Sequence, residues 1–177
     1  ADFRSPDVGS RTTGPGHQGW VVGGPVRIGA QGSATAFVDP LRAILEQDVC
    51  KLGPKEVIHT FSDGDFPDGL AFDCEGSVWV ACVVSNRVIR VDKNGQGSIV
   101  IEDPNPTIIA NAEAKFAGEG LTFEDTYAGT VQTLGNVSSI AFGGPDLKTV
   151  YLGSLGAQRI ATFQSTIAGA QPPHWFY

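Results

Sequence analysis

The chain has 177 residues, of which 41% are hydrophobic, with 23 glycines and 11 prolines. That composition is typical of a turn-rich globular protein and argues against a disordered chain. The formal net charge is −7, from 12 Lys and Arg against 19 Asp and Glu. With no run of basic residues, this balance excludes a nucleic-acid-binding footprint. Because no stretch approaches 18 consecutive apolar residues, the sequence also predicts no membrane-spanning helix and no membrane partner.

Residues 1–23 are expected to form an irregular N-terminal arm. The sequence starting at Gly14 matches the GxGxxG pattern of dinucleotide-binding sites. Such a site requires a strand before the glycines and a helix after them, whereas here the β-prone Trp20 follows. We therefore reject a dinucleotide site. The chain also begins without a charged-then-apolar signal pattern, which favours a cytoplasmic protein.

The cysteines support the same compartment. Cys50, Cys74 and Cys82 are an odd number with no CxxC spacing. Cys74 and Cys82 could face each other across a hairpin, but buried free thiols are the favoured interpretation, and these suit a reducing compartment. The sequence therefore predicts a cytoplasmic location.

Residues 24–62 have the pattern of a first β-propeller blade. Strands are expected at 26–28, 34–38, 41–46 and 55–61, with a turn at 48–54 between the last two. The third of these segments could alternatively be a short helix, because Ala, Leu and Glu favour helix. We favour strand there because the repeat requires it.

Residues 66–103 show the same pattern more clearly. Four short antiparallel strands are expected, the content of one blade. The first two should be joined by a two-residue turn at Glu75-Gly76, where glycine supplies the positive φ. One carboxylate, Asp68, is expected just before the first strand, after Pro67, which stiffens its approach.

An insertion at 104–136 separates this blade from a third one at 137–170. The insertion is expected to contain a helix at 110–117 and to form a lid or rim. Ile28, Phe72 and Phe142 occupy the same slot in the three repeats, 44 and then 70 residues apart. The first interval is a blade period, and the second is a period plus the insertion. The predicted fold class is all-β, a β-propeller of about three four-stranded blades.

Several of these segments carry a family resemblance. They are Phe66 to Asp73 with Gly76 and Trp79, then residues 87–92, 139–144, 149–152 and 173–175. These segments resemble the family of senescence marker protein, gluconolactonase and luciferin-regenerating enzyme over about residues 52–175, and more loosely over 24–51. The resemblance implies a six-bladed propeller, of which this chain holds the C-terminal half. It further implies hydrolysis of lactones or related esters around one divalent metal on the propeller axis.

By the same resemblance, Asp68 is both a metal ligand and the catalytic carboxylate that orients or deprotonates water. The implied metal is Ca²⁺, with Mg²⁺, Mn²⁺ or Zn²⁺ as alternatives, since oxygen ligands suit hard cations. Gly24 stands where the family has an Asn, and Ser138 occupies the matching position in the following blade. A single carboxylate is not a calcium site. We therefore expect a homodimer or a missing N-terminal half to close the propeller and supply the other ligands.

Two other interpretations stay open. Asp68 could be a turn residue that caps local backbone, and the protein could be a non-catalytic propeller fragment or binding scaffold with a degenerate metal site. A strictosidine-synthase-like propeller is a further rival. In the leading hypothesis the partner is a small-molecule lactone or ester.

The remaining polar residues are given structural roles. Asp63 and Asp65 resemble a calcium loop, but Pro67 occupies a ligand position, which favours an acidic surface loop. His59 is expected to be a satisfied strand residue, and Trp79 to pack between blades. Replacement of Asp73 by Asn is expected to leave metal affinity and activity nearly intact.

Overall fold

The computed structural model describes residues 57–118, 120–129 and 132–171, together with the backbone of four short strands nearer the N-terminus. Strand β1 (Arg27–Ile28) pairs with β2 (Ala34–Thr35), and β3 (Ile44–Glu46) pairs with β4 (Val49–Lys51), both antiparallel. The strand at β3 agrees with the prediction and not with the helical alternative. Gly24, which stands where the family has an Asn, lies outside the described residues.

The strand predicted at 55–61 is wrong in its described part. Strand β4 lies inside the predicted turn, and residues 57–62 belong to no strand. Phe61 is nevertheless buried in the core with Ile58 packed beside it. His59 is held by a hydrogen bond between Nδ1 and the Gly95 carbonyl oxygen, 2.9 Å away. The apolar residues of this segment therefore reflect a packed loop, and His59 is satisfied without belonging to a sheet.

A four-stranded antiparallel sheet follows. It contains β5 (Pro67–Phe72), β6 (Val78–Cys82), β7 (Arg87–Val91) and β8 (Gly97–Glu102), paired in chain order. Every residue of β6 is buried. Because side chains alternate along a strand, Val80 packs on one face of the sheet with Phe61, while Trp79 packs on the other. Both faces of this sheet are therefore covered by protein.

The second sheet contains β9 (Val137–Gly143), β10 (Thr149–Ser154) and β11 (Ala161–Gln164), in the order β11-β10-β9. Among the described residues this sheet has three strands, one fewer than the four predicted. After β11 the chain turns back to the first sheet, where Cys74 N–H donates to the Ala168 carbonyl and Ala170 N–H to the Phe72 carbonyl. The backbone there bonds the β5–β6 hairpin and adds no fourth strand.

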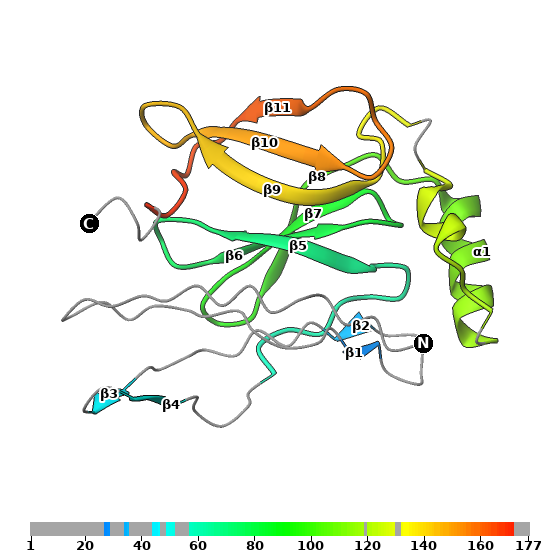
Figure 1. Ribbon diagram of the computed structural model, residues 1–177, viewed down its shortest axis with the longest axis horizontal. Coiled ribbons are helices and arrows are strands. Elements are labelled where there is room, and N and C mark those ends of the chain that lie inside the picture. Colours follow the sequence, from blue (N-terminus) through cyan, green and yellow to red (C-terminus); the bar gives the residue numbers. More distant parts are fainter. Residues whose placement is uncertain are drawn as a thin grey trace.

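The two sheets pack face to face as neighbouring layers (Figure 1). Trp79 lies between them, edge-on to Phe142 at 5.0 Å and stacked on Phe163 at 6.4 Å between ring centroids. Trp79 is therefore a packing residue, as predicted. Strands β5 and β9 are both edge strands of their sheets, and they lie in contact. The buried side chains of this interface are Trp79, Ala81, Val88, Leu134, Val137, Ile140, Val150 and Leu152.

The predicted helix is confirmed and is longer than expected. Helix α1 (Pro106–Ala117) begins four residues before the predicted start, because Asn105 caps it and Pro106 fits its first turn. A short 3-10 helix, η1 (Glu124–Tyr127), follows. Helix α1 stands at one end of the two sheets (Figure 1) and packs through Ala112 and Phe116 on Phe66.

The β5–β6 connection is a five-residue turn, longer than the two-residue turn predicted. Strand β5 ends at Phe72 and β6 begins at Val78, with Gly76 at φ +79° as expected for the turn. Asp73 is buried and accepts hydrogen bonds from the backbone of Glu75 (3.0 Å) and Ser77 (2.9 Å). The longer loop follows from this side-chain capping, which holds the turn open around the carboxylate.

Cys74 and Cys82 are both free thiols, as predicted, but only Cys82 is buried; the predicted burial is wrong for Cys74, which is exposed on the β5–β6 turn. Cys50 lies outside the described side chains. Burial raises the pKa of the Cys82 thiol, and the nearby Asp65 carboxylate raises it further. Within the described part of the chain, no helix has the length and apolar character needed to cross a membrane.

Candidate functional site

Asp68 lies in a β-bulge on β5, the edge strand of the first sheet that contacts β9. Pro67 pairs with Cys82 and Leu70 with Val80, so three steps along β5 match two along β6. One extra residue is therefore inserted at Asp68-Gly69. A bulge breaks the side-chain alternation of its strand and redirects a side chain, which is why bulges are frequent beside active sites. Asp68 thus lies within β5, and not just before it as predicted.

The Asp68 carboxylate has no hydrogen-bond or ion-pair partner among the described residues, and its side chain is exposed. The surrounding protein still desolvates part of the carboxyl, and this burial raises its pKa above the usual value. The exposure is what bears on ligand access, because a ligand must reach the oxygens. The capping role considered for Asp68 is not seen, since no described backbone N–H donates to it.

Gly69 allows the edge strands β5 and β9 to lie close together. A Cβ at this position would lie 2.4 Å from the Ser138 carbonyl oxygen and 2.8 Å from the Ser139 Cα. Only a residue without a side chain allows β5 and β9 to approach this closely. Asp68, the neighbour of Gly69, is consequently held close to the start of β9.

Asn86 fixes the start of β9 against the first sheet. It is fully buried in the left-handed conformation, at φ +52°. Its Oδ1 accepts a hydrogen bond from Val137 N–H at 3.1 Å, and its Nδ2 donates to the Asp103 carbonyl at 3.0 Å. No sequence motif predicted a role for this residue. The one available sequence signal was an Asn between two predicted strands, which indicates a residue with positive φ, because Asn tolerates positive φ better than most residues.

The loop before β5 contains a second carboxylate, Asp65. The sequence predicts an acidic surface loop here, but Asp65 is only 3% exposed, whereas Asp63 is exposed. The prediction is wrong for Asp65 because Arg87 lies 3.4 Å from its Oδ1 and gives it a charged partner. Burial raises the Asp65 pKa, against the opposing effects of Ser85 and Arg87.

Helix α1 borders the same end of the first sheet. Glu113 accepts a hydrogen bond from Gly64 N–H, and a Cβ on Gly64 would lie 2.3 Å from the Ile109 Cγ2. Phe66, two residues before Asp68, packs on the helix. The insertion therefore forms part of the rim around the strand end that carries Asp68.

The donor set fits a hard cation in kind but not in number. Asp68 offers carboxylate oxygens, which Ca²⁺ and Mg²⁺ prefer. Among the described residues, however, no group of three or more His, Cys, Asp or Glu side chains could hold an ion. Calcium takes about six to eight oxygen ligands. A complete site therefore needs further oxygen ligands besides the carboxylate of Asp68.

Comparison with known families assigns this part of the chain. The family model described as "SMP-30/Gluconolactonase/LRE-like region" matches residues 40–122. The chain contains a gluconolactonase-like region. That region runs from β3 to the end of α1 and includes Asp68, while β9 lies beyond it. The family resemblance and the fold class, an all-β partial β-propeller, are both confirmed.

The chain was also compared with solved structures and with curated proteins. A solved structure of a luciferin-regenerating enzyme is similar over 80% of this chain and 44% of its own, at 17% sequence identity and a TM-score of 0.47. This chain therefore spans less than half the length of that enzyme. No curated protein matches the sequence.

Proposed function

We propose that the protein is a metal-dependent hydrolase of lactones or related esters, with Asp68 at its site. The observation that carries this proposal is the bulge at Asp68. The bulge lies on edge strand β5, within the gluconolactonase-like region, and it carries an exposed carboxylate without a described partner. A carboxylate left without internal partners in an otherwise well-packed sheet is available to a ligand.

Hydrolysis of a lactone requires water to attack the carbonyl carbon. The bond between that carbon and the ring oxygen then breaks, and the ring oxygen takes up a proton to give a hydroxy acid. In this proposal the Asp68 carboxylate orients the attacking water and accepts its proton, as a general base must do from hydrogen-bond distance. Gly69 and Asn86 contribute by holding β9 against the strand that carries Asp68.

Asp68 is also the residue that would hold the metal, with Ca²⁺ first and Mg²⁺, Mn²⁺ or Zn²⁺ as alternatives. A bound divalent ion supplies a Lewis acid that polarises the substrate carbonyl. We propose that the remaining ligands come from a second copy of the chain or from further blades of a longer protein. Cytoplasmic location stays part of this proposal, supported by the free thiols Cys74 and Cys82.

A second candidate is a non-catalytic binding scaffold. The scarcity of carboxylates around Asp68 favours it, since the described residues contain no metal-ligating cluster. Such a scaffold would bind the same oxygen-rich small molecules without turning them over. Turnover and binding must therefore be measured separately.

The test compares Asp68→Asn with Asp63→Asn. Asp63 is an exposed carboxylate five residues upstream, so the control removes the same charge. Asp68→Asn should leave the unfolding free energy within about 0.5 kcal/mol of the parent, because the side chain is exposed and has no described partner. Calcium affinity, measured by calorimetry, should fall at least about tenfold, since ligand charge tunes such sites over decades. Lactone hydrolysis should fall about 100-fold or more.

The control should match the parent in all three measurements. A parent that binds Ca²⁺ or lactone without turnover would replace the hydrolase with the binding scaffold. An Asp68→Asn variant that is destabilised but binds metal as well as the parent would remove Asp68 from the site.

A further inference from the structure

The first sheet's bulge has a counterpart in the second sheet. Along β9, Ser139 pairs with Gly153 and Val137 with Ser154, so Ser138 is the extra residue. Along β5 the extra residue lies at Asp68-Gly69. When the two strands are aligned by their bulges, Ser138 takes the place of Asp68. Both strands therefore break their alternation at the same level and on the same kind of edge.

The flanking side chains show where the alternation breaks. Val137 and Ile140 both pack into the core between the sheets, although they are three residues apart. In a regular strand, residues three apart point to opposite faces. The bulge at Ser138 absorbs that difference. Leu70 occupies the corresponding position of β5. It packs against the buried cluster that contains Phe61, on the face of the first sheet that is turned away from the second sheet.

The two bulges are also adjacent in space. The backbone of Ser138 lies directly against Gly69, close enough that a Cβ on Gly69 would overlap the Ser138 carbonyl oxygen. Asn86 holds Val137, the residue before Ser138, from the first sheet. Ser138 is partly exposed, and its hydroxyl has no described hydrogen-bond partner. A hydroxyl at this place can both donate to and accept from a bound molecule.

We infer that Ser138 is a second residue of the Asp68 site, whose hydroxyl hydrogen-bonds an oxygen atom of the bound lactone or of the hydroxy acid formed from it. The inference rests on the proposed function for its substrate class. Ser138 is a substrate-positioning residue: it holds the ground state and the transition state alike, so its loss should raise KM with little change in kcat.

Ser139 provides a matched control one residue further along. It is exposed, and its Oγ lies over Gly153, where a Cβ would come within 2.1 Å of it. Its hydroxyl therefore lies against the β10 side of the sheet. Ser138→Ala and Ser139→Ala remove the same group from adjacent positions of one strand. Neither change should alter the melting temperature, since no described group loses a partner.

The experiment uses the full chain with two probes. Hydrolysis of glucono-δ-lactone gives kcat and KM, and calorimetry with D-gluconate, its hydroxy acid, gives a dissociation constant without turnover. Ser138→Ala should raise both KM and the gluconate dissociation constant about threefold to tenfold, the value of one hydrogen bond. Ser139→Ala should stay within twofold for both, and Asp68→Asn is measured alongside as the reference.

The outcomes separate the inference from the function on which it rests. If Asp68→Asn is impaired while Ser138→Ala matches the parent, Ser138 is not in the site and the proposed function stands. If Ser138→Ala weakens gluconate binding in a parent without turnover, the inference holds and the hydrolase fails. A parent that neither binds nor hydrolyses overturns both. Equal losses in both serine variants, with lower melting temperatures, would make Ser138 structural and overturn the inference.

Discussion

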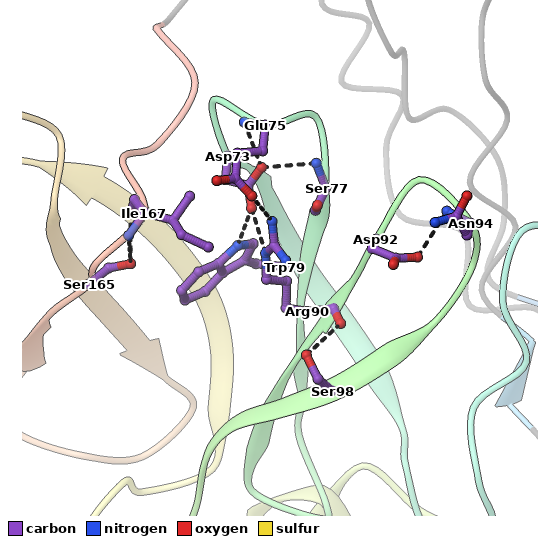
Figure 2. Close-up of polar contacts among 10 residues, drawn as sticks. All are labelled: Asp73, Glu75, Ser77, Trp79, Arg90, Asp92, Asn94, Ser98, Ser165 and Ile167. Atoms are coloured by element: carbon purple, nitrogen blue, oxygen red, sulfur yellow. Dashed lines mark hydrogen bonds and ion pairs between the residues drawn. The ribbon is translucent and has the colours of Figure 1, made fainter.

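Two aspartates at opposite ends of the β5 strand show how the same side chain takes on different roles. Asp68 is exposed, lies in a bulge and has no described partner. Asp73 is fully buried, and its carboxylate accepts from Trp79 Nε1 at 3.0 Å and from Arg90 Nε at 2.7 Å (Figure 2). Two turn N–H groups complete its coordination. The carboxylate whose partners are all internal stabilises the fold, and the one without them is available to a ligand.

The largest expected effect comes from replacing the satisfied carboxylate. In Asp73→Asn, one oxygen can still accept from the turn, but the new NH₂ group faces the donors of Trp79 and Arg90. Leaving buried donors unpaired, with Arg90 only 19% exposed, should lower the unfolding free energy by about 3 kcal/mol. Urea unfolding measures this loss. Asp73 is therefore a poor neutral control for Asp68, because Trp79 and Arg90 converge on it from other strands.

Asp92 is the control for this prediction. It caps the β7–β8 turn in the same way, accepting from the backbone of Asn94 and Gln96 at 2.8 Å each, and the neighbouring Asn94 is the one described side chain that hydrogen-bonds it. Asp92→Asn keeps one acceptor oxygen for both bonds and should change stability little. If the two variants lose equal stability, turn capping and not the buried network explains Asp73.

A smaller loss of stability is expected from adding a side chain at Gly69, where β5 and β9 pack closely. Gly69→Ala would place a Cβ 2.4 Å from the Ser138 carbonyl oxygen, a backbone atom that cannot rotate away. Overpacking of this kind costs about 1–3 kcal/mol. The variant should also weaken ligand binding at Asp68, because β9 must move. Gly120→Ala is the control, since its Cβ would have no contact closer than 3.8 Å. Unchanged stability and binding in Gly69→Ala would show that the two bulges need not be adjacent.

The sequence allows the strands of the first sheet to be predicted because they depend on local pattern, although it placed Asp68 before β5 and not in the bulge within it. The alternation in Val78, Trp79 and Val80 and the turn glycine Gly76 required no tertiary information. The packed loop at Phe61 could not be recognised, because its apolar residues have the spacing of a strand but contribute to the core without pairing.

The site was less predictable than the fold. From the sequence, Ser138 was noted only as the residue that matches Asp68 in the following blade, because the one-residue offset in β9 pairing is not revealed by any pattern of residue types. The partners of Asp65 and Asp73 are arginines on β7, 22 and 17 residues away in the chain. Single-sequence reasoning assigns exposure from residue type, and a carboxylate buried by a distant arginine is the case in which that assignment fails.

The smallest expected effect on stability concerns Asp65. Its environment is intermediate between those of Asp68 and Asp73, because it is buried like Asp73 but has fewer hydrogen-bond partners. Its Oδ1 has no hydrogen bond, and Arg87 contacts it only at 3.4 Å. Burial raises its pKa in the folded protein, with His59, Arg87 and Ser85 opposing and the neutral Cys82 thiol nearby.

The sign of the pH dependence follows from that direction. A carboxyl with a raised folded pKa binds its proton more tightly in the folded state than in the unfolded state. The folded protein is therefore favoured below the unfolded pKa of about 3.9, and this advantage is lost as pH rises through the folded pKa. Asp65→Asn, which mimics the neutral acid, should become progressively more stable relative to the parent between about pH 4 and pH 7. Urea midpoints across this range test it, with Asp63→Asn as the exposed control expected to show no such trend. If the difference is flat or reversed, the ion pair with Arg87 outweighs desolvation, and Asp65 belongs with Asp73 among the satisfied carboxylates.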